Sequence, residues 1–246
     1  MLQKERTDAI MQVLQENGYV TVKFLVEKLH YSNATINRDL NFLQKQNLVK
    51  RSYGGVEIVK NKGVRLPFRY HKMKSVKTLL SKKATEMVED GDVIFIDGTT
   101  TTEYMGHFLE DKKDITVITN NIALVMHLAE MRIKVICLGG SVVEPPYMLC
   151  GADTVENASR YRADKVFFSS GRVSEEGFLD SGWAYAEMRQ KMMENSDKVI
   201  YLADHEKITD VKGKTLCFSD VDVVITDFKF DEKVKEKYAD VEFVEI

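Results

Sequence analysis

The sequence predicts an α/β protein with two parts: a small, mainly helical domain at residues 1–60 and a larger domain with a mainly parallel β-sheet at residues 72–246. Three short helical patterns occupy most of the first part, and two β-prone segments around a glycine pair follow them. In the second part, β-branched runs alternate with amphipathic helical patterns. That alternation is typical of a parallel sheet covered by helices on both faces.

The composition is that of a globular chain. Of the 246 residues, 44% are hydrophobic and 30% are charged, which argues against a disordered or collagen-like protein. The longest apolar runs fall far short of the roughly 20 residues that a membrane-spanning helix needs, and the first residues lack the apolar core of a secretory signal. We therefore expect a cytoplasmic protein without a membrane segment.

The three cysteines, Cys137, Cys150 and Cys217, form no Cys-x-x-Cys pair and stand next to aliphatic residues. Buried, reduced thiols explain this pattern better than zinc ligands or disulfides do. We expect no metal site and no cofactor.

Charge is unevenly distributed along the chain. Residues 1–62 contain ten Lys or Arg and six Asp or Glu, a net charge of +4, whereas the whole chain has a net charge of -3. The N-terminal part alone is therefore suited to a polyanion, although an ordinary fluctuation of this size is an equal alternative.

The first two helices are predicted from apolar spacing and capping residues. A helix at residues 4–17 ends before Gly18, which most easily adopts the left-handed conformation that terminates helices. Thr21 can cap a second helix of about eight residues. The apolar positions of these two helices are Ile10, Val13 and Leu14, then Val22, Leu25, Val26 and Leu29.

A third helix follows after two or three residues, with Ser32 as its N-cap and Ile36, Leu40 and Leu43 on its apolar face. The residues off that face are Asn33, Thr35, Asn37, Arg38 and Asn41. Amides and a guanidinium near a helix N-terminus are suited to base edges and phosphates in a DNA major groove. A solvated polar face is the structural alternative.

Two short strands are predicted next, at residues 48–51 and 56–59, around the turn Ser52-Tyr53-Gly54-Gly55. Lys50, Arg51 and Tyr53 lie at the edge of this hairpin. Such a wing beside a helix-turn-helix is well placed to touch a phosphate backbone.

The segment ERTDAIMQVLQENGYVTVKFLVEKLHYSNATINRDLNFLQKQNLVKRSYGG resembles the winged helix-turn-helix of the DeoR family of bacterial transcription regulators. The family pattern Ser-x-x-Thr-Ile-Arg-Arg-Asp-Leu is matched except at Asn37, where the family usually has arginine. The resemblance implies a double-stranded DNA operator as partner. The DNA-binding candidates are Ser32, Asn33, Thr35, Asn37, Arg38, Lys50, Arg51 and Tyr53. A protein-interaction module is the alternative for this domain.

Residues 61–71 form the expected linker, because they include a proline, a glycine and basic residues without periodicity. A helix follows with Val76, Leu80, Ala84 and Val88 on one face and ends at Gly91. Six strands are then expected at residues 93–96, 115–118, 134–138, 165–168, 199–202 and 223–226. Helical patterns at residues 103–109, 122–131 and 185–195 separate several of them.

In parallel sheets, ligands bind at the carboxyl ends of the strands, so the loops after each strand are the candidate binding site. Asp97-Gly98-Thr99-Thr100-Thr101-Thr102 follows the first strand and runs into a helix, which offers hydroxyls and a helix N-terminus to an anionic oxygen. A generously capped helix is the alternative. Asn120 and the pair Gly139-Gly140 follow the next two strands, and Lys207 follows the fifth. No nucleotide P-loop or dinucleotide motif occurs.

The motifs IDGTTTT, VITNN, LGG and LADHEK occur in the order seen in the DeoR-family sensor domain. That domain has a Rossmann-like fold similar to ribose-5-phosphate isomerase and typically binds a phosphorylated sugar effector. The resemblance implies that the threonine loop holds the phosphate and that Lys207 supports it. The effector-binding candidates are Asp97, Gly98, Thr99, Thr100, Thr101, Thr102, Asn120, Gly139, Gly140, Arg172 and Lys207.

Two departures from the family pattern affect this site. The loop reads Gly98-Thr99 where relatives have a small residue and then glycine. After the fourth strand, Gly171 and Arg172 replace the usual aspartate and glycine. We hypothesise that Arg172 approaches the effector and favours extra negative charge on it; exposure to solvent, or an ion pair with Glu175 or Glu176, is the alternative.

The rival function is a sugar-phosphate isomerase-like enzyme that carries an accessory DNA-binding domain. The segment Ser169–Arg172, which corresponds to the carboxylate-rich loop of the isomerases, contains no acid. We therefore expect a regulator that acts as a repressor of a carbohydrate-metabolism operon, and not an enzyme. A homodimer or homotetramer is expected, because one small winged helix covers too little DNA for high specificity.

Overall fold

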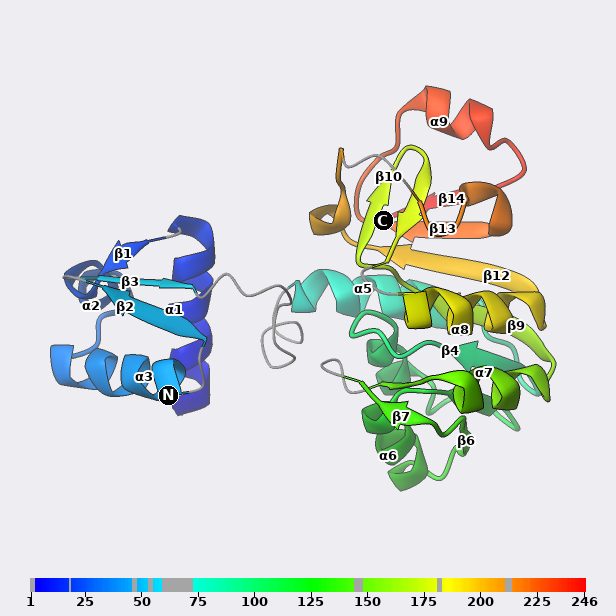
Figure 1. Ribbon diagram of the computed structural model, residues 1–246, viewed down its shortest axis with the longest axis horizontal. Helices are drawn as coiled ribbons and strands as arrows, with labels where there is room; N and C mark the ends of the chain where they lie inside the picture. Colours follow the sequence, from blue (N-terminus) through cyan, green and yellow to red (C-terminus); the bar gives the residue numbers. More distant parts are fainter. Residues whose placement is uncertain are drawn as a thin grey trace. The chain divides into compact units, whose positions relative to one another are not determined.

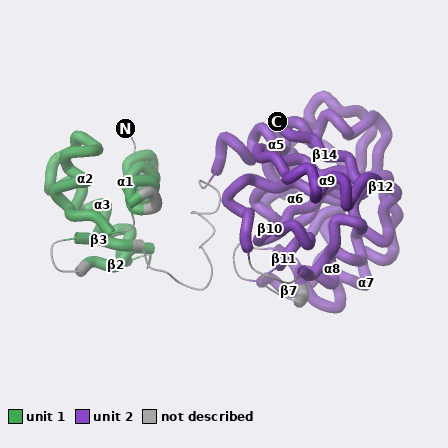
Figure 2. The backbone as a smooth tube through the Cα atoms, turned by 90° about the horizontal axis from the view of Figure 1, so that it is seen from above, with its two compact units in different colours: residues 1–71 green, residues 72–246 purple. Residues whose placement is uncertain are grey.

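The computed structural model describes residues 3–17, 19–45, 48–52, 55–58, 73–143, 148–180, 183–210 and 214–246. The chain forms two compact units, residues 1–71 and residues 72–246 (Figure 2). Residues 59–72 lie outside the described residues and include the expected linker at 61–71. Among the described residues, no helix is long and apolar enough to cross a membrane.

Among its described residues, the first unit contains three helices in the predicted order: α1 (Gln3–Asn17), α2 (Val22–Leu29) and α3 (Asn33–Lys45) (Figure 1). The Thr21 hydroxyl caps α2 by accepting from the backbone N–H of Phe24 at 3.1 Å. Ser32 caps α3 in the same way, because its hydroxyl accepts from the N–H of Thr35 at 3.2 Å. Both N-caps were predicted from the sequence.

The wing is an antiparallel hairpin of β2 (Val49–Ser52) and β3 (Gly55–Ile58). A two-residue strand, β1 (Val20–Thr21), joins the other edge of β3, so the sheet order is β1-β3-β2. The β1 strand ties the turn between α1 and α2 to the wing. Tyr53 and Gly54, at the tip of the predicted hairpin, lie outside the described residues.

One apolar core holds this unit together, formed by the predicted faces of the three helices and by Val20, Val49 and Val56 from the strands. A buried ion pair reinforces it. Arg6 of α1 donates from Nε and Nη2 to the carboxylate of Asp39 on α3 at 2.8 and 3.1 Å. Asp39 is fully buried, so its role in the motif is to fasten α3 against α1.

The second unit is built on a seven-stranded, fully parallel sheet with the order β14-β13-β12-β9-β4-β5-β6. From the centre outward on one side its strands are β4 (Val93–Ile96), β5 (Thr116–Thr119) and β6 (Lys134–Cys137). On the other side they are β9 (Ala163–Phe168), β12 (Ser196–Ala203), β13 (Val223–Thr226) and β14 (Glu242–Glu245).

Helices cover both faces of the sheet (Figure 1). One apolar cluster packs α5 (Lys74–Thr85), the 3-10 helix η1 (Thr102–Phe108) and α6 (Ile122–Glu130) against one face. The opposite face packs against α7 (Ala152–Ser159), α8 (Trp183–Glu194) and α9 (Glu232–Lys237). Central strands are therefore buried on both sides, which explains their continuous β-branched sequence.

Two small hairpins and two short 3-10 helices complete the unit. The hairpins are β7 (Ser141–Val142) with β8 (Leu149–Cys150), and β10 (Arg172–Ser174) with β11 (Gly177–Leu179). The 3-10 helices are η2 (His205–Lys207) and η3 (Phe218–Asp220).

The structure corrects the prediction that all three cysteines are buried. Cys150 is buried, but Cys217 is only partly covered and Cys137 is exposed. Cys137 ends β6, and β6 is an edge strand with only one neighbour in the sheet. The thiols are free, as expected. Burial raises the pKa of Cys150 to about 11.

Candidate functional site

The candidate site lies where the sheet reverses its strand order. The chain runs outward from β4 through β5 and β6, then returns to the other side of β4 with β9. The loops that follow β4 and β9 therefore diverge at a topological switch point, which is where open α/β sheets bind ligands. At this point the N–H of Asp97 donates to the carbonyl of Phe167 at 3.0 Å, and the N–H of Ser169 donates to the Asp97 carboxylate at 3.2 Å.

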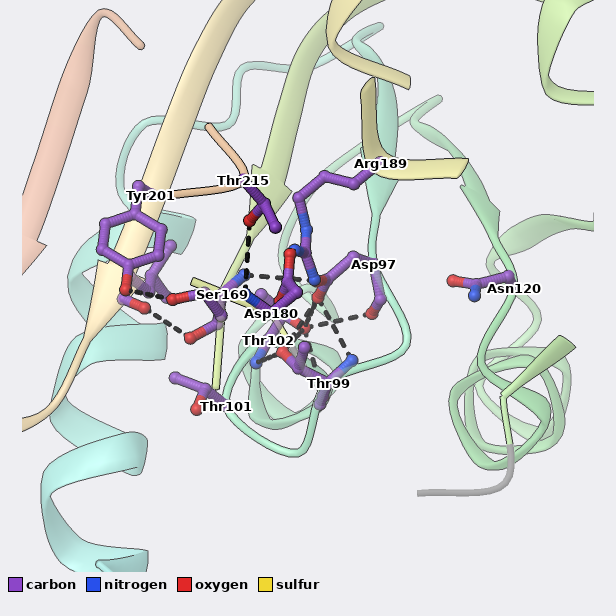
Figure 3. Close-up of polar contacts among 12 residues, drawn as sticks. Asp97, Thr99, Thr101, Thr102, Asn120, Ser169, Asp180, Arg189, Tyr201 and Thr215 are labelled. Carbon is purple, nitrogen blue, oxygen red and sulfur yellow. Dashed lines mark hydrogen bonds and ion pairs between the residues drawn. The ribbon is translucent and has the colours of Figure 1, made fainter. Parts of the chain in front are cut away.

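The four threonines after β4 divide into two pairs. The hydroxyls of Thr99 and Thr102 donate to Oδ1 of Asp97 at 2.9 and 2.6 Å, and the two hydroxyls lie 2.9 Å apart. Both side chains therefore hold the loop around the buried carboxylate (Figure 3). This pair fits the structural alternative, in which threonines serve their own loop.

The second pair contacts two lysines. Lys77 of α5 donates from Nζ to the hydroxyl of Thr100 at 3.0 Å. Lys207 of η2 donates from Nζ to the hydroxyl of Thr101 at 3.0 Å and also contacts the hydroxyl of Ser169. Two ammonium groups from different elements thus converge on adjacent threonines of one loop.

Both lysines are unusually covered for their residue type. Lys77 is 5% exposed and the Lys207 side chain is 13% exposed. Lys207 also forms an ion pair with Asp204, whose carboxylate oxygen lies 3.9 Å from its Nζ. Because both ammonium groups donate to hydroxyls of the same loop, this pair of cations is chemically suited to an anion placed between them.

The helix after the loop differs from the prediction. η1 is a 3-10 helix of 7 residues, and the side chain of Thr101 does not cap it. A helix this short provides little macrodipole. The capacity of the site for an anion therefore comes from the two lysines and the hydroxyls.

A buried ion triad lies behind the threonine loop. Arg189 of α8 donates from Nη2 to Asp97 at 3.1 Å and from Nη1 to Asp180. The three side chains are at most 5% exposed. Burial opposes the charge on Arg189, but the two carboxylates outweigh it and raise the pKa of its guanidinium. Asp97 and Asp180 therefore serve this arginine.

Gly98, the second residue of the loop, lies next to Asn120, which follows β5. Asn120 is fully buried, and its amide donates to the carbonyl of Leu149 at 2.9 Å. Within the described part of the chain, its Oδ1 atom has no hydrogen-bond partner. A β-carbon on Gly98 would lie 2.5 Å from Cβ of Met148 and 3.2 Å from the Asn120 amide, so only glycine fits there. Figure 3 shows Asn120 apart from the Asp97 cluster.

The glycines after β6 contact α7. The carbonyl of Gly139 accepts from the hydroxyl of Thr154 at 2.8 Å. A β-carbon on Gly140 would lie 2.0 Å from the same hydroxyl, and Gly140 has a φ of +112°. Close contact therefore explains the need for glycine at Gly140, whereas at Gly139 only the φ of +71° favours glycine.

Arg172 begins β10 and is exposed. Its carbonyl accepts from the hydroxyl of Ser170 at 2.7 Å, and that hydroxyl lies 2.7 Å from the Tyr201 hydroxyl. These bonds fix the backbone at Arg172.

In the first unit, the predicted DNA-binding residues lie together on α3 and β2. Asn33 and Arg38 are exposed, and Thr35 and Asn37 are partly exposed. The Ser32 and Thr35 hydroxyls lie 2.9 Å apart. On β2, Lys50 is exposed and Arg51 is partly exposed. Tyr53 falls outside the described residues.

Sequence reasoning missed Lys77, Ser81 and Arg189, which all lie on helices. Lys77, Ser81 and Thr85 recur every four residues and form a buried polar stripe beside the apolar face of α5. The Ser81 hydroxyl donates to the carbonyl of Thr101 at 2.6 Å. This polar stripe was visible in the sequence as Lys-x-x-x-Ser-x-x-x-Thr. No comparable spacing marked Arg189.

Comparison with known proteins identifies both units. Residues 6–62 match the model of the DeoR-like helix-turn-helix domain, and residues 72–228 match that of the DeoR C terminal sensor domain. The chain is 30% identical to the HTH-type transcriptional repressor GlcR of Bacillus subtilis, over 92% of this chain and 89% of the relative. It is also 30% identical to the glycerol-3-phosphate regulon repressor of Escherichia coli, over 84% of this chain and 83% of the relative.

Similar solved structures include ribose 5-phosphate isomerase from Plasmodium falciparum, with 14% identity and a TM-score of 0.42. That match covers 56% of this chain and 54% of the isomerase. The two family models and the full-length relatives carry the assignment: this chain belongs to the DeoR family, and it is a DNA-binding transcription regulator and not an enzyme.

Proposed function

We propose that this regulator represses a carbohydrate-metabolism operon and that a phosphorylated sugar, bound at the threonine loop, modulates its hold on DNA. The observation that carries the proposal is the convergence of Lys77 and Lys207 on the adjacent threonines Thr100 and Thr101. The names of two relatives, a glycerol-3-phosphate regulon repressor and a lactose phosphotransferase system repressor of Staphylococcus aureus, support this class of regulated genes.

A phosphate monoester suits this arrangement because it has several strong acceptor oxygens and close to two negative charges. Charge-assisted hydrogen bonds from two ammonium groups are stronger than the present bonds from lysine to threonine hydroxyls. The phosphate would then accept hydrogen bonds from both ammonium groups, and the hydroxyls of Thr100, Thr101 and Ser169 would remain as additional donors. The sugar would extend toward Asn120 or Arg172.

The coupling to DNA would run through α5. Lys77 contacts the candidate phosphate site directly, and Ser81 on the next turn holds the backbone of Thr101. α5 is also the first helix after residues 59–72, which connect the two units covalently. A ligand that binds Lys77 would therefore change the position that α5 prefers, and α5 is joined to the DNA-binding unit through residues 59–72.

On the DNA side, we propose that α3 enters the major groove with Ser32, Asn33, Thr35, Asn37 and Arg38, and that Lys50, Arg51 and Tyr53 of the wing lie close to the duplex. A homodimer or homotetramer would read repeated half-sites about 34 Å or a multiple of that apart. A DNA target supports a cytoplasmic location for the protein. The alternative of an isomerase-like enzyme has no support from Asp97 and Asp180, which bind Arg189.

A thermal-shift screen of the full-length chain tests the effector site. The panel would contain inorganic phosphate, pentose and hexose phosphates, glycerol 3-phosphate and the unphosphorylated sugars. A ligand at 100 times its Kd stabilises by about 2.7 kcal/mol, which corresponds to roughly 5–10 °C for a unit of this size. Lys77→Met and Lys207→Met should each reduce the shift at a fixed ligand concentration, whereas Lys134→Met on the exposed edge strand β6 should retain it.

Operator binding measured with and without the stabilising compound then tests the coupling. Ser81→Ala should still bind the compound but respond to it less on DNA, because the contact to Thr101 is lost. If every phosphorylated sugar leaves the melting temperature unchanged, or if both lysine variants shift as the wild type does, the proposed effector site is wrong.

A further inference from the structure

Three asparagines form a stripe on the exposed side of α3. Asn33, Asn37 and Asn41 recur every four residues, so they lie one above the other along the helix. The Asn37 amide donates to the carbonyl of Asn33 at 2.9 Å and also contacts the Asn33 side chain. This bonding turns the Oδ1 atom of Asn37 away from Asn33.

The side chain of Arg51, on strand β2 of the wing, lies against this stripe of asparagines. Successive residues of a strand point to opposite faces. Val49 of β2 is 1% exposed and packs in the core beneath α3, so Arg51, two residues later, points to the same side. Lys50 points to the other side and is exposed. Two neighbouring cations of the wing therefore have different surroundings.

Two hydrogen bonds fix the Arg51 guanidinium. Nη2 donates to Oδ1 of Asn37 at 2.5 Å, and Nη1 donates to Oδ1 of Asn41 at 2.8 Å. Because each terminal nitrogen carries two protons, each can serve an asparagine and donate a second proton elsewhere. The planar group is thus held in a defined orientation over the polar face of α3, while Arg51 stays partly exposed.

We infer that Arg51 reads a base edge, with guanine as the matching base, and that Asn37 and Asn41 are the residues that position it. A phosphate contact needs only charge at about the right distance, whereas a bidentate contact to the O6 and N7 atoms of guanine needs a planar fork held in place. The two asparagines supply that restraint from the helix that enters the groove. This inference rests on the proposed DNA interface of α3 and the wing.

The experiment starts with duplexes enriched from a random library by the full-length wild-type chain. Binding is then measured for the best duplex and for all its single-base-pair variants, with wild type, Arg51→Lys, Arg51→Ala, Asn37→Ala, Asn41→Ala and Lys50→Ala. Arg51→Lys is the decisive variant, because it retains the charge and loses the planar fork. Lys50→Ala is the matched control from the opposite face of the strand.

Arg51→Lys should weaken binding to the best duplex by about 5- to 150-fold and abolish discrimination at one or two base-pair positions. The asparagine variants should weaken discrimination at the same positions, and Asn37→Ala should add little in the Arg51→Ala background, because the two residues act as one unit. Lys50→Ala should weaken all duplexes by one similar factor and lower the salt slope by about one.

If Arg51→Lys keeps the full base preference while Arg51→Ala weakens all duplexes alike, Arg51 is a phosphate contact and the inference is overturned. If the asparagine variants change discrimination at other positions only, their positioning role is overturned. Failure of the wild-type chain to enrich any sequence would instead overturn the proposed interface itself.

Discussion

Removing Arg189 should destabilise the second unit strongly, because the arginine neutralises two buried carboxylates. In Arg189→Met, the side chains of Asp97 and Asp180 remain at most 5% exposed in the native fold but lose their shared cation. Removing one partner of a buried ion pair typically costs about 3–5 kcal/mol. For a unit of 150–250 residues, each kcal/mol lowers the melting temperature by roughly 2–4 °C. We therefore expect Arg189→Met to lower it by about 6–20 °C.

The assay is guanidinium unfolding of the full-length chain followed by tryptophan fluorescence. The chain has a single tryptophan, Trp183, and it lies on α8 of the second unit. The signal therefore reports the unfolding of that unit alone. Thermal unfolding observed by the same signal gives the change in melting temperature.

Two further variants make this prediction specific. Adding Asp180→Asn to Arg189→Met should recover part of the loss, because it removes one of the two uncompensated charges. Arg162→Met breaks an exposed pair with Asp197, whose side chains are 71% and 66% exposed, so it should cost about 1 kcal/mol or less. A loss in Arg189→Met no larger than that of Arg162→Met would refute the reasoning.

Two other predictions concern pH and backbone space. The hydrogen bond from His205 to Asp227, at 2.5 Å, raises the pKa of His205. This bond therefore stabilises the folded state fully at pH values below the unfolded pKa of about 6.5. Its contribution to stability is lost as pH rises through the folded pKa. The melting temperature of the wild type should therefore fall across that pH range. An equal fall of melting temperature with pH in Asp227→Asn would contradict this prediction. Gly140→Ala should cost at least about 1–3 kcal/mol, because its β-carbon would lie 2.0 Å from the Thr154 hydroxyl. Gly139→Ala is the control for the effect of positive φ alone, because the nearest atom to its β-carbon would be 3.7 Å away. In chemical denaturation it should lower the free energy of unfolding by less than Gly140→Ala does.

The six strands that the sequence revealed are the five inner strands of the sheet and one edge strand, β6. All six predicted strands are present, because continuous β-branched runs are typical of central parallel strands. The seventh, β14, reads Glu242-Phe243-Val244-Glu245 and lies at the sheet edge, where exposure permits charged residues. The short hairpin β10–β11 was also missed, because its strands have only three residues each.

The site residues that could be predicted from the sequence are those that directly follow strands. Asp97, the threonines and Lys207 come directly after β4 and β12, so the topology of a parallel sheet brings them together. Lys77 and Arg189 reach the same place from helices on opposite faces of the sheet. Their long side chains meet the loop only once those helices are packed, and nothing in local spacing fixes that packing.

The different origins of the two lysines set a condition for any effector. Lys207 belongs to η2 at the carboxyl end of β12, whereas Lys77 belongs to α5, from which the chain leads to the DNA-binding unit. A ligand shifts a conformational equilibrium only by the difference in its affinity for the two states. An anion that contacts Lys207 alone would bind equally well wherever α5 lies, so it would occupy the site without changing the hold on DNA. An anion held by the threonine loop that also contacts Lys77 favours the arrangement in which α5 lies close to that loop. Lys77→Met should therefore convert a releasing effector into a weakly bound silent ligand, whereas Lys207→Met should weaken binding and leave the response at saturation intact. Competition binding with labelled operator at saturating ligand distinguishes these outcomes, and equal saturated responses in the two variants would rule out this role of Lys77.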